Sequence, residues 1–300
     1  MRKLLIFSVL CFSLILLAAC GSEESSGSGG EGEGEGSEDL LTTLKEKGTV
    51  TVGFANEKPY AYQEDGELKG AAVDIAEAVF KELGIDTVEG KLADFSQLIP
   101  GLNAGKFDVI TAGMAINPDR CENVDFGAPE MMYGEGLVVQ AGNPLDLHSY
   151  KDIAENPDAT VSIMQGATEN EYVKSEGVSQ DQIQSAPDIP ATFSAVSSGR
   201  ASATTGTEMS LKMALETSES DNLEFITDFE QPDIKGIPSY GAAAFHKDSD
   251  TLREAYNEKL AELKEDGTVK KLLEANGFSA ENNSVPADIT TEGVCSGEQY

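Results

Sequence analysis

The sequence has no tryptophan, only two histidines and only four cysteines among its 300 residues. The histidines, His148 and His246, are far apart in the chain, and no two cysteines have the C-x-x-C spacing. Metal sites in proteins draw on closely spaced cysteine and histidine ligands. We therefore expect no metal and no cofactor.

Basic residues are also scarce: 21 Lys and Arg stand against 53 Asp and Glu, which gives a net charge of -32. A nucleic-acid-binding protein needs a basic face, so we expect no nucleic-acid partner. The acidic composition fits a protein in concentrated salt, where ions screen the repulsion between like charges. A merely well-solvated surface is an equally good explanation.

The apolar run at the N-terminus, Leu4–Leu17, is short for a membrane span. With Arg2 and Lys3 before it and Leu-Ala-Ala-Cys-Gly at its end, it resembles a bacterial lipoprotein signal that occupies residues 1–20. The resemblance implies that acyl chains on Cys20 anchor an exported protein to the outer face of the cell membrane. An ordinary cleaved secretion signal is the alternative.

Residues 21–40 predict a flexible acidic tether, because up to Gly36 they are Gly, Ser and Glu with no large apolar side chain. The remaining part, about 260 residues, is long for one core and natural for two lobes. We expect lobe 1 to contain residues 41–141 and 240–300, and lobe 2 to contain residues 142–239. The hinges are expected near Ala141 and near Ser239-Tyr240.

Strand and helix patterns alternate through both expected lobes. Thr49–Phe54 has the β-branched alternation of a strand, and Ala71–Leu83 has one apolar helical face followed by Gly84. An α/β fold of two lobes with a ligand cleft between them follows. The other expected strands are 87–91, 107–111, 134–140, 160–163, 183–185, 203–205, 223–226 and 240–245, and the other main expected helices are 95–104, 150–154, 191–198, 208–215, 249–265 and 268–276.

The stretch Phe107–Arg120 predicts a small-anion site. A strand is expected to pass into a small-residue loop, Ala112–Ala115, and Pro118 then suits the first turn of a helix. Ligands of open α/β sheets bind beyond the carboxyl ends of strands, and the planar guanidinium of Arg120 matches a carboxylate. A surface salt bridge is the alternative for this arginine.

Two cysteines remain after removal of the signal, which contains Cys11. An isolated pair in an exported protein predicts a disulfide, here between Cys121 and Cys295. It would hold the C-terminal tail beside the Arg120 loop. Two free thiols are the alternative.

From Val50 to the tail, the sequence resembles the family 3 extracytoplasmic solute-binding proteins of ABC importers. The opening strand with Pro59-Tyr60 and the runs GLKGAAVDIAEAVFKELG and LIPGLNAGKFDVITAGM carry the resemblance. It implies the two-lobe periplasmic-binding-protein fold (type II) with two hinge crossings, no catalytic residues, and ABC permease subunits as partners. A monomer is expected. Segments 53–62, 88–114, 118–121, 141–154 and 290–295 are most similar to members that bind ectoine or hydroxyectoine.

The resemblance also implies where a ring zwitterion such as ectoine would be held. Arg120 would bind its carboxylate, helped by backbone N–H groups near Asn117 and Thr168. Glu57 and Glu169 would accept the N–H groups of the amidinium ring. A solvated loop position is the alternative for Glu57, and stabilisation of a helix N-terminus is the alternative for Glu169.

Aromatic faces for the amidinium would come from Tyr60 and Phe95, for which core packing is the alternative. The ectoine binders usually have a third aromatic residue where this sequence has Ala115. Tyr62 or Tyr133 could replace it.

Thr207 occupies the place where amino-acid binders of the family carry an aspartate. A neutral hydroxyl is a poor partner for a primary ammonium group in a dry cleft, which argues against ordinary α-amino acids. A polar amino acid or another zwitterion, such as a betaine, remains the alternative ligand. A cyclohexadienyl-dehydratase-like enzyme, with Glu169 as the acid, is a weaker alternative because the expected cleft contains no histidine or cysteine.

Overall fold

The computed structural model describes residues 39–218 and 220–299, which belong to one compact unit. The expected signal, Cys20 and the tether as far as residue 38 lie outside them. Within the described ranges, no helix has the length and apolar character that crossing a membrane requires.

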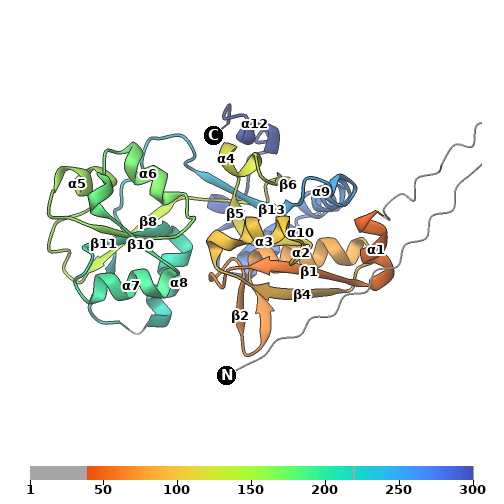
Figure 1. Ribbon diagram of the computed structural model, residues 1–300, viewed down its shortest axis with the longest axis horizontal. Helices are drawn as coiled ribbons and strands as arrows, with labels where there is room; N and C mark the ends of the chain where they lie inside the picture. Colours follow the sequence, from red (N-terminus) through yellow and green to blue (C-terminus); the bar gives the residue numbers. More distant parts are fainter. Residues whose placement is uncertain (1–38, 219, 300) are drawn as a thin grey trace, which may run out of the picture. The chain divides into compact units, whose positions relative to one another are not determined.

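One sheet combines strands from both ends of the chain (Figure 1). In the described residues it has six strands in the order β4-β1-β5-β13-β6, and β7 also pairs with β13. β4 and β5 run parallel to β1, whereas β13 runs antiparallel to β5. The strands are β1 (Thr49–Phe54), β4 (Thr87–Leu92), β5 (Val109–Ala115), β6 (Asp125–Phe126), β7 (Met131–Tyr133) and β13 (Ser239–Phe245).

Most helices of this first lobe also follow the expected pattern. The described helices are α1 (Leu40–Lys47), α2 (Ala71–Glu82), η1 (Phe95–Gln97), α3 (Leu98–Asn103), α4 (Pro118–Cys121), α9 (Asp250–Glu265), α10 (Thr268–Ala275), α11 (Ala280–Asn283) and α12 (Thr291–Cys295). A hairpin of β2 (Tyr62–Glu64) and β3 (Glu67–Lys69) follows β1. The sequence analysis did not predict α1, the β2–β3 hairpin, α11 or α12.

The second sheet belongs to the middle of the chain, which is green in Figure 1. Five strands pair in the order β10-β9-β11-β8-β12 in the described residues, with β9 parallel to β10 and β11 and with β8 antiparallel to β11 and β12. The strands are β8 (Glu135–Gln140), β9 (Val161–Met164), β10 (Ile183–Ala186), β11 (Ala203–Thr207) and β12 (Leu223–Phe225). The helices are α5 (Tyr150–Glu155), α6 (Glu169–Ser175), η2 (Gln180–Gln182), α7 (Ile189–Ser197) and α8 (Glu208–Ser218).

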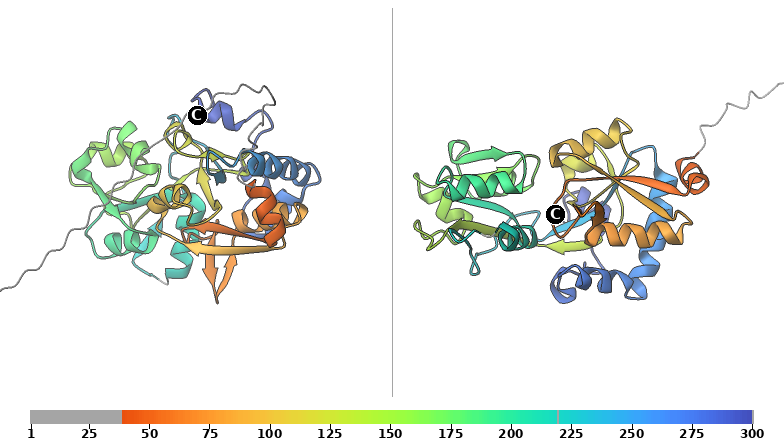
Figure 2. Two further views of the ribbon diagram at one scale, coloured as in Figure 1. Left: turned by 45° about the vertical axis from the view of Figure 1, so that its right-hand side comes forward. Right: turned by 90° about the horizontal axis from the view of Figure 1, so that it is seen from below.

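The chain crosses between the sheets at Gly134, which separates β7 from β8. The sequence placed this crossing at Ala141 and therefore assigned β8 to lobe 1. Strand pairing places β8 in the second sheet instead, because its partners are β11 and β12. The return crossing enters β13 at Ser239, where β13 pairs with β7 (Figure 2, right).

The expected small-residue loop Ala112–Ala115 is a bulged part of β5. Ala115 pairs with Gly241, and the register between β5 and β13 shifts between Ala242 and Ala244. Gly113 has a φ of 59°, which an L side chain rarely adopts, and the ring of Tyr60 occupies the space of a Cβ at this position. A bulge at a left-handed glycine bends the strand while the pairing on both sides continues.

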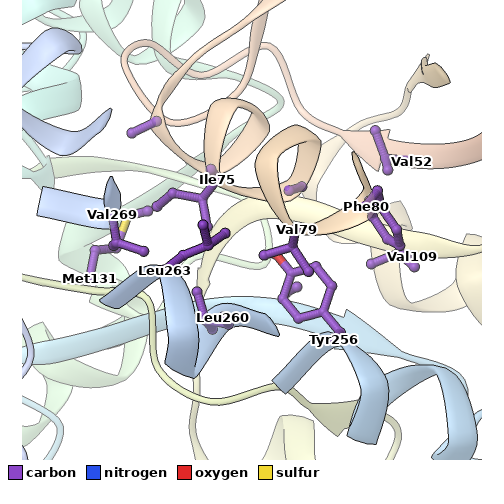
Figure 3. Close-up of a cluster of buried hydrophobic side chains, with 14 of the residues drawn as sticks. Val52, Ile75, Val79, Phe80, Val109, Met131, Tyr256, Leu260, Leu263 and Val269 are labelled. Carbon is purple, nitrogen blue, oxygen red and sulfur yellow. The ribbon is translucent and has the colours of Figure 1, made fainter. Parts of the chain in front are cut away.

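The core of the first lobe packs the apolar face of α2 against β1, β5 and α9 (Figure 3). Ile75, Val79 and Phe80 from α2 are fully buried there, and Phe80 meets the ring of Tyr256 edge-to-face. The hydroxyl group of Tyr256 donates to the buried carboxyl group of Glu130. This packing gives β5, which ends at the cleft, a rigid support.

The expected disulfide is present: Cys121 and Cys295 are joined, with their Cα atoms 5.7 Å apart. The bond links α4 to α12 and so attaches the C-terminal tail to the helix that contains Arg120.

Replacement of both Cys121 and Cys295 by serine should lower the free energy of unfolding by about 2–5 kcal/mol, because the bridge closes a long loop of the unfolded chain. Urea denaturation of the wild type and the variant measures this difference. Wild-type protein unfolded in the presence of reductant is the control and should match the variant. A difference below about 1 kcal/mol would contradict the prediction.

Candidate functional site

Arg120 is placed by the start of α4. Asn117 caps this helix, since its Oδ1 accepts the backbone N–H of Arg120 at 2.8 Å, and Pro118 occupies the first helical position. The cap fixes the direction in which the short helix leaves β5. The expected helix start at Pro118 is therefore confirmed.

The guanidinium group of Arg120 is buried between the two lobes. Its Nη1 donates to the carbonyl of Ala115 at 2.7 Å, and its Nη2 donates to the carbonyl of Gly166 at 2.8 Å. It also lies over the ring of Phe95, 5.4 Å from the ring centroid. Because Ala115 ends β5 and Gly166 follows β9, this single side chain connects the two sheets.

Gly166 allows the lobes to approach each other. Its φ is 82°, and the Cα of Ser96 lies 3.0 Å from the position that a Cβ would take. A larger residue there would be strained and would push the loop away from η1.

Glu57 lies in the loop after β1 and reaches across the cleft to α8. The hydroxyl group of Ser210 donates to its Oε1 at 2.5 Å, and the hydroxyl group of Thr207 donates to Ser210 at 3.0 Å. Burial raises the pKa of Glu57 to about 7, although the hydrogen bond from Ser210 opposes this rise. Glu169 raises this pKa further, and Arg120 lowers it.

Tyr60, Tyr133 and Phe95 form an aromatic wall. The rings of Tyr60 and Tyr133 meet edge-to-face with centroids 5.3 Å apart, and the Tyr133 hydroxyl group donates to the carbonyl of Gly113 at 2.6 Å. Tyr133 thus lies beside β5, the strand that contains Ala115. Ala115 occupies the position where the ectoine binders of the family usually have a third aromatic residue. Tyr62 lies elsewhere, under the Lys58 ammonium group and outside the cavity described next.

A small cavity of about 30 Å³ lies at the centre of these groups. We call it the central cavity, and it has room for only one or two water molecules. The structure gathers most of the expected site residues around it. Those that line it are Glu57, Tyr60, Phe95, Arg120, Thr168, Glu169 and Thr207, and Tyr133 lines it as well.

A larger cavity of about 490 Å³ adjoins the central cavity, and Arg120 and Thr168 line both. Asn117, which was expected at the site through its backbone, lines this larger cavity. Its volume falls in the range of small-molecule pockets. Among the described residues, no cluster of His, Cys, Asp or Glu could hold a metal ion.

Glu135 is a part of the site that the sequence analysis missed. It begins β8, is 1% exposed, and neither of its carboxyl oxygens receives a hydrogen bond from an N–H or hydroxyl group of the described residues. Burial raises its pKa well above the usual value, and the facing carboxyl group of Glu169 raises it further. The only sequence signal was an acidic residue between two glycines at the start of an apolar strand.

Burial also raises the pKa of Glu169, against the effects of a hydrogen bond from its own backbone N–H, its contact with Glu135 and the charge of Arg120. Glu169 begins α6 and lines the central cavity. The site therefore combines Arg120, the half-buried Glu57, the buried Glu169 and an aromatic wall, with Glu135 in contact with Glu169. Such a set can hold a small molecule that carries both a carboxylate and a cation.

Residues 50–277 match the sequence-family model of the bacterial extracellular solute-binding proteins, family 3. The chain belongs to this family. The mixed α/β structure is accordingly the two-lobe type II periplasmic-binding fold, as the sequence predicted. The protein is a solute-binding protein of an ABC importer, and its family works outside the cytoplasm.

Three proteins illustrate the similarity. A probable amino-acid ABC transporter periplasmic-binding protein, y4tE of Sinorhizobium fredii (strain NBRC 101917 / NGR234), is 37% identical over 85% of this chain and 86% of its own length. The crystal structure of EhuB in complex with hydroxyectoine is 35% identical, with a TM-score of 0.77 over 85% of this chain and 97% of that structure. The crystal structure of the ancestral amino acid-binding protein AncCDT-1, a precursor of cyclohexadienyl dehydratase, is 28% identical. Its TM-score is 0.67 over 78% of this chain and 98% of that structure.

The Ser210→Ala variant should raise the pKa of Glu57 above about 7, because the hydroxyl group of Ser210 stabilises the ionised carboxylate. Hydrogen bonds to charged groups contribute roughly 1.5–3 kcal/mol, so the change is measurable. Carbon-13 NMR titration of labelled glutamate carboxyl groups gives the value. Thr217→Ala on the same helix is the control, since the Thr217 hydroxyl group bonds to the Met213 carbonyl. An unchanged pKa in Ser210→Ala would show that the bond does not form in solution.

Proposed function

We propose that this solute-binding protein captures ectoine or hydroxyectoine and delivers it to the permease of an ABC importer. The observation that carries the proposal is the juxtaposition of Arg120 with Glu57 and Glu169 around one cavity beside an aromatic wall. Ectoine carries a carboxylate and a cyclic amidinium, and each has a matching partner in this set. The similarity to EhuB, which was crystallised with hydroxyectoine, supports this choice of solute.

The carboxylate of the solute would bind to Arg120. A guanidinium group has five N–H donors, and the bonds to the carbonyls of Ala115 and Gly166 engage Nη1 and Nη2. The planar fork of a guanidinium group matches the two oxygens of a carboxylate. Thr168 lines both cavities beside Arg120, and its backbone N–H and hydroxyl group are donors for the same carboxylate.

The amidinium ring would lie between Glu57 and Glu169, one from each lobe. Glu169 is buried and Glu57 is half-buried, and both line the central cavity. The faces of Tyr60, Tyr133 and Phe95 surround the same space. A delocalised cation against aromatic faces gains about 0.5–2 kcal/mol for each contact when water is excluded.

Capture requires the lobes to open. The central cavity, about 30 Å³, is too small for a ring zwitterion in this conformation. The hydrogen bonds that connect the lobes across it include those from Arg120 to Gly166 and from Ser210 to Glu57. We propose that both break when the chain rotates at its two crossings, and that the 490 Å³ cavity beside Arg120 is the entrance.

The lipid anchor on Cys20 is also part of the proposal, since the sequence around it resembles a lipoprotein signal. It would hold the protein at the outer face of the membrane, close to the permease.

A second candidate is an amino-acid solute, and one observation favours it. The amino-acid binders of this family carry an aspartate where this chain has Thr207, but Glu135 stands directly opposite Thr207 in the β8–β11 pair. Directly opposed residues project from the same face of a sheet. A carboxyl group is therefore present near the expected position of an ammonium group after all.

The Arg120→Ala variant should lose about 3–5 kcal/mol of binding free energy, which is a hundredfold or greater loss of affinity, because a buried carboxylate would lack its partner. Calorimetry with ectoine, hydroxyectoine, glycine betaine, arginine and glutamine measures affinity and selectivity together. Arg200→Ala, which changes an exposed arginine of lobe 2, is the control. A clear preference of the wild type for arginine or glutamine would favour the second candidate.

The affinity for ectoine should be constant above about pH 7 and should fall about tenfold for each pH unit below it. The pKa of Glu57 is about 7, and only its ionised form accepts an amidinium N–H, so binding at lower pH must first remove a proton. Calorimetry from pH 5 to pH 8 measures the profile. The Glu57→Gln variant should bind weakly with a flatter profile, and a wild-type affinity that rises on acidification would refute the role of Glu57.

A further inference from the structure

Glu135 is buried at the start of β8, between lobe 2 and groups of lobe 1, and no described residue stabilises a negative charge on it. Its side chain is 1% exposed, and among the described residues no N–H or hydroxyl group donates to either carboxyl oxygen. Its backbone is held in place, because Gln231 binds both its N–H and its carbonyl, at 2.8 and 2.7 Å. A buried carboxylate without donors is very unfavourable, so the carboxyl group is expected to retain its proton.

Among the residues that the structure describes, the charged groups that act on Glu135 are both acidic. Glu169 from α6 contacts it, and Glu57 from lobe 1 acts on it at longer range. The hydroxyl groups of Tyr60 and Tyr150 are the other titratable neighbours. Thr205 donates its hydroxyl hydrogen to the Gly136 carbonyl, so Tyr150 must donate its own to Thr205 and cannot give it to Glu135.

Glu169 is the member of the pair that is suited to be ionised. It accepts a hydrogen bond from its own backbone N–H, and it faces the guanidinium group of Arg120. Glu135 has neither kind of support. Two carboxyl groups in contact can be joined only by a hydrogen that one of them donates, and these environments place that hydrogen on Glu135.

We propose that Glu135 is protonated at neutral pH and donates its carboxyl hydrogen to Glu169, so that Glu169 is fixed as an ionised acceptor facing the solute. Glu135 is then a positioning residue that acts through Glu169. This inference rests on the proposed function only for the identity of the solute. The contact between Glu135 and Glu169 does not require closure of the cleft, because both residues belong to lobe 2.

The proton on Glu135 would affect which class of solute the site binds. Three ionised glutamates and Arg120 would give the site a charge of -2, and one retained proton changes it to -1. A protonated Glu135 is also unable to neutralise an ammonium group opposite Thr207. The site is then set for a cation that needs two acceptors, Glu57 and Glu169, and it disfavours a primary ammonium group.

Infrared difference spectroscopy of the unliganded full chain at pH 8 tests the proton directly. Glu57 and Glu130, each with a pKa of about 7, are largely ionised at that pH. The carbonyl band of a protonated, buried carboxyl group should be present in the wild type, absent in Glu135→Gln and retained in the control Glu130→Gln. The absence of this band from the wild type, or its survival in Glu135→Gln, would overturn the proposal.

Solute affinity provides the second test. A glutamine at position 135 can still donate an N–H to Glu169, so Glu135→Gln should bind ectoine within about threefold of the wild type. Glu135→Leu has no donor and should bind at least tenfold more weakly. Equal loss in both variants would show that a charge on Glu135 contacts the solute and would overturn the proposal. If the wild type binds only amino acids, the choice of solute fails, and the infrared band still decides the protonation of Glu135.

Discussion

The guanidinium group of Arg120 is the group on which the arrangement of the two lobes depends. It is buried, and a buried cation must have acceptors or the folded state is strongly destabilised. The carbonyls of Ala115 and Gly166 supply them from opposite sides of the cleft. The hydrogen bonds that satisfy the arginine therefore also connect the lobes, and any solute bound to it affects both lobes at once.

Acidic groups around this arginine exceed the charge that it can neutralise. Glu135 and Glu169 are buried and Glu57 is half-buried, and desolvation is the largest cause of the raised pKa of each. The structure offsets the free-energy cost of removing these carboxylates from water to a different extent for each residue. Glu57 accepts a hydrogen bond from Ser210 and Glu169 accepts one from its own backbone N–H, whereas no described residue donates to Glu135. These differences divide three chemically identical side chains into distinct roles.

Local patterns predicted most of the elements because those patterns are set by near neighbours in the chain. Thr49–Phe54 forms β1 as expected, and the Asn117-Pro118 helix start is present with its cap. The pairing of β8 could not be predicted, because it depends on β11 and β12, which are formed by residues far along the chain. The bulge at Gly113 was likewise hidden, since pairing with β13 converts an apparent loop into a strand.

For the site, resemblance to a family indicated which residues would meet, whereas their contacts required the structure. The sequence offered Tyr62 and Tyr133 equally as the missing aromatic, and only the three-dimensional arrangement places Tyr133 beside Tyr60. Glu135 was not considered, because a charged residue at the start of a strand is normally assumed to face water. Its burial follows from its position opposite Thr207, where β8 passes beneath the cleft.

This cross-strand pair changes what the absence of an aspartate at position 207 means. A neutral residue there would exclude an ammonium group only if no other acid lay beside it, and Glu135 is the cross-strand partner of Thr207. The charge of that acid, rather than its presence, then determines the class of solute. A carboxyl group that donates its hydrogen to Glu169 is uncharged, so it cannot balance the charge of an ammonium group. On this proposal, selectivity in the cleft depends on one proton, which Glu135 retains because no described residue offers it a cation or a hydrogen-bond donor.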